Sequence, residues 1–139
     1  MVDERRVRRL LQRIADDVAF LRRHAAGRAQ EVREDEVLSS AVKYRFVTAI
    51  EGCIDVAQHL CSSEGWGPPD DNADALRLLG RRGVLEQLLA GSMATAVGFR
   101  NVLVHEYAEV DDERVVAFID RLADLEAFVT ASAAWLETA

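Results

Sequence analysis

Apolar residues recur every three or four positions along most of the chain, and no segment shows the strict apolar–polar alternation of a half-buried strand. A first run of this kind covers about residues 4–25, and a second covers about residues 35–62. In the first run the apolar positions are Val7, Leu10, Leu11, Ile14, Val18 and Leu21, and in the second they are Val42, Phe46, Ile50, Cys53, Ala57 and Leu60. This spacing keeps apolar side chains on one side of a helix, so both runs are predicted to be amphipathic helices.

Glycine and proline break the pattern between residues 61 and 72, where the sequence reads "CSSEGWGPPDDN". Asp71 or Asn72 can cap a short helix over residues 73–80, which we expect to end near Gly80 and Gly83. Two longer helices are predicted over about 84–105 and 112–137, and Asp3 and Asp111 are candidate caps of the first and last helices. The fold class is therefore predicted as all-α, an antiparallel bundle of about five helices forming a single domain over residues 1–139.

The charge balance limits how this chain could bind nucleic acid. It has 17 basic and 24 acidic residues, a formal net charge of −7. Broad, non-specific binding to nucleic acid is driven by neutralising phosphates with Lys and Arg. In an acidic chain, any contact with nucleic acid therefore has to be local, at a cluster of arginines. The first helix carries one such group, Arg5, Arg6, Arg8, Arg9, Arg13, Arg22 and Arg23. We interpret it as a solvated face, with contact to an RNA backbone as the alternative.

The sequence gives no sign of a membrane span or of a secretory signal peptide, so we expect no membrane partner and a cytoplasmic location. Cys53 and Cys61 fall eight residues apart in one predicted helix, about 12 Å along its axis. At that separation they cannot form a disulfide, and a metal site would need more ligands than these two thiols.

Four polar residues crowd the end of the fourth predicted helix, in the stretch "GFRNVLVHEY" at residues 98–107. On a helical wheel they lie opposite the main apolar stripe. They are Arg100, Asn101, His105 and Tyr107. Met93, Val97 and Val104 fall among them instead of the Lys and Glu expected at a solvated surface. We therefore expect a second surface to be covered on this side of the helix.

A matching polar stripe lies on the second predicted helix. With Glu51 as reference, it holds Tyr44, Thr48, Gly52, Asp55 and His59 within about 100° on the wheel, with Arg45 at its edge. Carboxylates facing a site that holds an arginine and a histidine could orient both groups. The alternative is a solvated face, and the sequence does not decide which of Glu51, Asp55 and His59 faces the site.

The octet "RNVLVHEY" at residues 100–107 matches the signature of one family: an arginine, four to six residues, a histidine, one residue and a tyrosine. The asparagine after the arginine also fits, and "YRFVTAIEGCIDVAQHL" at residues 44–60 looks like that family's second helix. On these residues the chain resembles the HepT-like toxins, a branch of the HEPN ribonuclease superfamily. The resemblance covers essentially the whole chain.

The resemblance implies an all-helical homodimer in which the motifs of both subunits meet in a cleft. It also implies an endoribonuclease, with a structured RNA such as tRNA as one candidate substrate. We expect cleavage without a metal ion, with the ribose 2′-hydroxyl attacking the adjacent phosphate. His105 is then the acid or base, Arg100 holds the phosphate, and Asn101 positions either group. Glu51, Asp55 and His59 are the supporting residues.

Tyr107 has a separate expected role. In the family that the chain resembles, a type VII-like toxin–antitoxin pair, a small nucleotidyltransferase antitoxin transfers AMP from ATP onto the motif tyrosine. Tyr107 lies within about 20° of Arg100 on the wheel, so an added nucleotide would block access of phosphate to the arginine. The chain itself would need no cofactor, since ATP and magnesium belong to the antitoxin.

Two other readings stay open on sequence alone. The dimer could be a non-catalytic module that binds a nucleotide or RNA end, or that docks the nucleotidyltransferase. Alternatively, the polar residues could serve as interface hydrogen bonds in a purely structural bundle.

Overall fold

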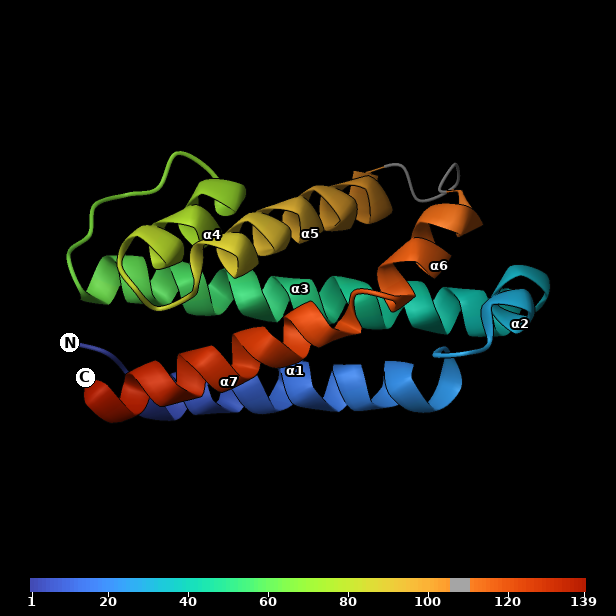
Figure 1. Cartoon of the computed structure of the whole chain (residues 1–139), viewed down its shortest axis with the longest axis horizontal. Coiled ribbons are helices and arrows are strands. Elements are labelled where there is room, and N and C mark those ends of the chain that lie inside the picture. The colour runs from blue at the N-terminus through green and yellow to red at the C-terminus, as the bar shows by residue number, and fades with distance from the viewer. Residues whose placement is uncertain (106–110) are drawn as a thin grey trace.

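The computed structural model describes residues 1–105 and 111–139, and within these ranges the chain forms seven helices and no strand (Figure 1). They are α1 (Glu4–His24), α2 (Ala29–Glu34), α3 (Glu36–Ser63), α4 (Asn72–Arg81), α5 (Gln87–His105), α6 (Asp112–Ile119) and α7 (Leu122–Thr138). The all-α fold class predicted from the sequence is therefore confirmed.

Aspartates begin several helices, because a carboxylate oxygen can accept one of the N–H groups left free in the first turn. Asp3 accepts from the N–H of Arg6 at 3.1 Å and begins α1. Asp71 accepts from Asp74 N–H at 2.7 Å and begins α4, and Asp111 accepts from Glu113 N–H at 2.9 Å and begins α6. The caps predicted at these three positions are confirmed.

The helices differ from the prediction in three places. The short α2 is additional, and α5 begins at Gln87 because the N–H groups of Val84 and Leu85 both bond back to Leu79 O. The predicted fifth helix is divided into α6 and α7. At the division Arg121 N–H donates to Phe118 O at 2.9 Å, a tight turn that ends α6. No glycine or proline marks this turn, so the sequence pattern alone did not reveal it.

The long helix α3 occupies the centre of the bundle (Figure 1). Helix α1 runs along one side of it, while α4 and α5 pack along the other and α7 lies against α1. At Gly52 of α3 the two long helices approach closely, since a Cβ atom placed there would lie 2.8 Å from Ile14 Cγ1. On the other side, the ring of Phe99 on α5 stacks on Phe118 of α6 at 3.9 Å and meets Phe46 of α3 edge-on at 5.5 Å.

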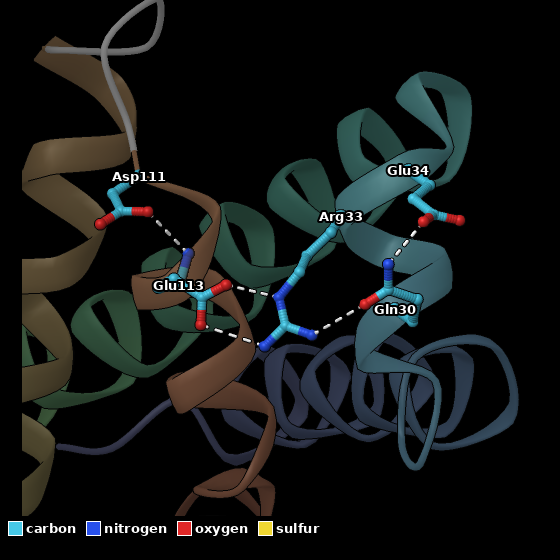
Figure 2. Close-up of polar contacts among 5 residues, drawn as sticks. All are labelled: Gln30, Arg33, Glu34, Asp111 and Glu113. Carbon is cyan, nitrogen blue, oxygen red and sulfur yellow. Dashed lines mark hydrogen bonds and ion pairs between the residues drawn. The ribbon is translucent and has the colours of Figure 1, made fainter.

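A salt bridge fastens α6 to α2 (Figure 2). The guanidinium of Arg33 donates from Nε and Nη2 to the two carboxylate oxygens of Glu113, and the Nη2–Oε2 distance is 3.0 Å. Its Nη1 donates to Gln30 Oε1. Hydrogen bonding from Arg33 lowers the pKa of Glu113. This contact holds the helix that follows the "RNVLVHEY" stretch against the far end of the bundle.

Cys53 and Cys61 are free, as their spacing predicted, and the structure shows that both are buried. Burial raises the pKa of both thiols, because the charged thiolate is disfavoured away from water. Among the described residues, no group of three or more His, Cys, Asp or Glu side chains could hold a metal ion. None of the helices found in residues 1–105 and 111–139 has the length and apolar character needed to cross a membrane.

Candidate functional site

Arg100 connects the end of α5 to the middle of α3. Its Nη2 and Nε both donate to Glu51 Oε1, at 2.9 and 3.3 Å. The arginine side chain is 20% exposed and the glutamate 42%, so the pair lies at the surface with the guanidinium still partly reachable. Among the candidate residues on α3, Glu51 is the one whose carboxylate contacts the arginine.

Asn101 contacts the same guanidinium from its own helix, because Arg100 Nη1 donates to Asn101 Oδ1 at 2.9 Å. A guanidinium has five N–H donors, and three of those on Arg100 are engaged among the described residues. Two N–H groups thus have no partner there. The guanidinium is held in orientation and keeps donors that could reach a phosphate oxygen.

His105 is the last residue of α5 and its side chain is exposed. It makes no hydrogen bond or ion pair with any residue of the described ranges. It follows Asn101 by one helical turn, so these two side chains share a face of α5. From Arg100 it is five residues away, which corresponds to a rotation of about 140° and a rise of about 7.5 Å. Within one chain, the arginine and the histidine thus leave α5 in different directions.

The other two supporting residues predicted on α3 differ from each other. Asp55 is exposed one turn beyond Glu51, on the same face of the helix, and has no partner in the described parts of the chain. His59 does not belong to this site. Its Nε2 accepts a hydrogen bond from the backbone N–H of Asp3 at 2.9 Å, so it fastens the start of α1 to α3. The prediction that His59 supports the site is therefore corrected.

The prediction that apolar residues form a second surface on α5 is also corrected in part. Met93 and Val97 are buried in the core of the chain itself, at 0% and 2% exposure, while Val104 is 42% exposed. The exposed face of α5 lies elsewhere, along Leu88, Gly91, Thr95 and Gly98, and it leads to His105. Leu88 is 88% exposed, and nothing lies within 4 Å of a Cβ atom placed on Gly91 or Gly98. Up to His105, this face carries no charged side chain.

Tyr107 lies outside the described residues, so its predicted role stays a prediction.

A second polar cluster joins α1 to α3 and was not predicted. Asp17, 7% exposed, accepts from Arg45 Nη1 at 3.1 Å and from Thr48 Oγ1 at 2.6 Å. The Arg45 guanidinium also lies 4.3 Å from the centroid of the Phe20 ring. A signal for this cluster existed in the sequence, since Asp17 follows Ile14 at the spacing of the apolar stripe of α1.

The chain is similar to known proteins of one family. A model of the "Ribonuclease HepT-like" family matches residues 3–132. The chain is 30% identical over 104 residues to the mRNA nuclease HepT of Shewanella oneidensis, covering 74% of this chain and 78% of that protein. It is 35% identical over 65 residues to the tRNA nuclease HepT of Aphanizomenon flos-aquae, covering 47% of this chain and 44% of that one.

Among solved structures, the chain is similar to a tri-AMPylated HEPN toxin of Shewanella oneidensis in complex with an MNT antitoxin. The TM-score is 0.86 with 26% sequence identity, and the match covers 96% of this chain and 99% of that one. The likeness therefore extends over nearly the full bundle.

Proposed function

The chain belongs to the family of HepT-like ribonucleases, and we propose that it cleaves RNA without a metal ion, using Arg100 and His105. The observation that carries the proposal is the way Arg100 is held. Glu51 and Asn101 fix the guanidinium at the surface while two of its N–H donors have no partner among the described residues. An arginine oriented in advance is suited to a phosphate whose charge grows during reaction.

In the proposed reaction the RNA supplies its own nucleophile. The ribose 2′-oxygen attacks the adjacent phosphorus while its proton passes to a base, and the bond to the 5′-oxygen of the next nucleotide breaks as that oxygen gains a proton. The products are a 2′,3′-cyclic phosphate and a 5′-hydroxyl. His105 is the proton-transfer group, because imidazole titrates near neutral pH and this side chain is exposed. Arg100 stabilises the charge on the non-bridging phosphate oxygens.

We further propose that the working enzyme is a homodimer. Arg100 and His105 leave α5 in directions about 140° apart, so a second copy is the simplest way to bring both onto one phosphate. The uncharged, exposed face at Leu88, Gly91, Thr95 and Gly98 offers a surface for it, since small residues let two helices approach closely. A two-fold axis near the end of α5 would bring two copies of Arg100, Asn101 and His105 together.

Regulation is proposed to act at Tyr107. The similar Shewanella toxin is described as tri-AMPylated and in complex with an MNT antitoxin. In the same manner, a nucleotidyltransferase antitoxin would direct the Tyr107 hydroxyl oxygen to the α-phosphorus of ATP. Pyrophosphate then leaves and the tyrosine loses its proton. ATP and magnesium belong to that partner. Tyr107 follows His105 by two residues in the sequence, so the added phosphate and adenosine would compete with RNA near His105.

The cleavage proposal is tested with end-labelled RNA in buffer containing EDTA. We expect discrete cleavage products that end in a cyclic phosphate, and no cleavage of the same sequence made with 2′-deoxyriboses. Binding of the RNA without cleavage would favour a non-catalytic module. Cleavage of the deoxy strand would exclude attack by the 2′-oxygen.

The regulatory proposal is tested by mass spectrometry after incubation with a cognate nucleotidyltransferase, ATP and magnesium. We expect the parent protein to gain AMP on a peptide containing Tyr107, and the Tyr107→Phe variant to lack that modification. Tyr44→Phe is the matched control and should be modified like the parent. Equal gain of AMP by the parent and by Tyr107→Phe would contradict the assignment.

A further inference from the structure

One side of α3 is left uncovered between α1 and α5. Thr48 and His59 hydrogen-bond to α1, through Asp17 and Asp3. Glu51 instead accepts from Arg100 on α5, and Gln58 donates to Asn72 on α4. Between these two edges, Tyr44 and Asp55 are exposed. We call the surface formed by these two residues the α3 strip, and it begins beside Arg100.

Only Arg8 and Arg22 among the arginines of α1 have an acidic partner in the described parts of the chain: Arg8 contacts Glu4 at 2.9 Å, and Arg22 contacts Glu126. The other five are exposed and have none; they are Arg5, Arg6, Arg9, Arg13 and Arg23. Three of these five, Arg6, Arg9 and Arg13, line the same surface hollow. Arg9 and Arg13 are four residues apart and so share one face of the helix. In a chain with a net charge of −7, these three neighbouring guanidinium groups without acidic partners form a local concentration of positive charge.

These arginines lie next to the α3 strip. Arg13 lines a shallow surface hollow of about 310 Å³ together with Tyr44, Arg45 and Thr48. A second hollow is lined by Arg6 and Arg9 and shares Arg13 with the first. The Tyr44 side of this surface is accessible, since that residue is 66% exposed. An aromatic ring and guanidinium groups thus border the same hollow.

Three carboxylates also lie in this region. Asp17 is paired with Arg45 at 3.1 Å and with the hydroxyl of Thr48. Asp16 accepts a hydrogen bond from the neutral side-chain amide of Gln12 at 2.9 Å, and Asp55 is exposed, so neither has a cationic partner in the described parts of the chain. Three arginines without acidic partners therefore stand against two such carboxylates, and the positive charge exceeds the negative charge.

Arg13 lies at about the same level of the bundle as the proposed catalytic arginine, Arg100. On α3, Gly52 packs against Ile14 of α1, while the preceding residue, Glu51, contacts Arg100 of α5. Arg13 adjoins Ile14, so Arg13 and Arg100 are separated mainly by the width of α3. Packed helices have axes about 8–10 Å apart, which places the axes of α1 and α5 at most about 20 Å apart. A strand of a few nucleotides spans that distance.

We propose that Arg9, Arg13 and Tyr44 form an RNA-binding extension of the catalytic face. A single strand leaving Arg100 crosses the α3 strip, where a base stacks on Tyr44, and its backbone phosphates reach Arg9 and Arg13 on α1. Guanidinium groups without acidic partners suit phosphates, and an exposed aromatic ring suits the face of any base. The proposal rests on the proposed ribonuclease function and adds where the substrate is held outside the reacting bond.

The experiment measures binding separately from cleavage. A His105→Ala protein binds a fluorescein-labelled oligouridylate of about 16 nucleotides, followed by fluorescence anisotropy over a series of salt concentrations. In this background Arg9→Gln/Arg13→Gln is compared with Arg28→Gln/Arg77→Gln, which removes the same charge from other exposed positions. We expect the first pair to lose at least about tenfold in affinity and the second less than about twofold. Two lost phosphate contacts should also reduce the salt slope by about 1.4.

Tyr44→Ala should weaken binding by about 5- to 100-fold with an unchanged salt slope, and Tyr44→Phe should bind like the parent, because stacking needs the ring and not the hydroxyl. Equal affinity and slope for the two arginine pairs would overturn the proposal. So would sedimentation showing that Tyr44→Ala turns a dimer into a monomer, since the strip would then be a subunit interface. Failure of the ribonuclease function itself is seen separately, as absence of cleavage by the parent protein.

Discussion

Arg100 Nη2 lies 2.9 Å from Glu51 Oε1, and this one contact joins two helices whose contacting residues are 49 positions apart in the chain. Both side chains are partly exposed, at 20% and 42%, so water screens their attraction and the pair contributes little to stability. Its consequence is geometric, because it limits where the guanidinium of the proposed site can point.

The Glu51 contact can be tested as a positioning interaction. Glu51→Ala should lower kcat for RNA cleavage by about tenfold, since Arg100 then loses its fixed direction, while stability falls by no more than about 1 kcal/mol. Glu51→Gln keeps an oxygen acceptor and should recover most of the activity. Steady-state kinetics and urea unfolding measure the two effects. Asp55→Ala is the matched control, one turn further along α3, and should resemble the parent.

A loss of stability without a change in kcat would show that Glu51 is merely structural. An equal loss in the Glu51→Gln and Glu51→Ala proteins would argue that its charge, and not the orientation of Arg100, is what matters.

The composite nature of the site can be tested by mixing inactive subunits. Arg100→Ala and His105→Ala proteins are each expected to be inactive. If one site uses the arginine of one subunit and the histidine of the other, a mixed dimer contains one complete site. Random exchange makes half of the dimers mixed, and each mixed dimer has one working site instead of two. About a quarter of the parent activity should therefore be restored. No recovery after verified subunit exchange would place both residues of a working site in the same chain.

The close packing of α1 on α3 gives a prediction about stability. Gly52→Ala should destabilise the protein by about 1–3 kcal/mol, because the new methyl group would lie 2.8 Å from Ile14 Cγ1 and force a shift. Ser40→Ala, at an exposed position of the same helix, should change the free energy of unfolding by less than about 0.5 kcal/mol. Chemical denaturation measures both variants. A Gly52→Ala protein as stable as the parent would mean that the two helices separate without cost.

The Arg33–Glu113 salt bridge gives a prediction about pH. Arg33 lowers the pKa of Glu113 in the folded protein, so this pair stabilises the fold above the unfolded pKa of about 4.3. That contribution is lost as the pH falls through the lower folded pKa. Because both side chains are exposed, this contribution is small, and Glu113→Gln should have only a slightly lower urea midpoint than the parent at pH 7. The difference should shrink below about pH 4. Glu86→Gln, at an exposed glutamate, is the control. A difference that grows on acidification would contradict this account.

The sequence was sufficient for the features that depend on local pattern. The apolar spacing defined α1 and α3, and the aspartates that begin α1, α4 and α6 were recognised by their position before an apolar run. The division between α6 and α7 was missed, since the turn at Asp120 and Arg121 contains neither glycine nor proline. That break depends on how α6 packs on Phe99 and Phe46, which is tertiary information.

The candidate site shows the same limit. A helical wheel placed Glu51, Asp55 and His59 on one stripe of α3, yet residues of this stripe contact different parts of the bundle. Glu51 contacts α5, while His59 accepts from Asp3, 56 residues away. Periodicity gives the direction of a side chain from its own helix. It does not give the partner that another helix supplies there.

The central claim is that His105 transfers protons during RNA cleavage, and the direct measurement is the cleavage rate of His105→Ala on end-labelled RNA in EDTA. The rate should fall by about 10²- to 10⁴-fold, with circular dichroism and unfolding unchanged because the side chain is exposed. His24→Ala, another exposed histidine, should cleave at the parent rate. A His105→Ala protein that keeps more than half of the parent activity would contradict the account.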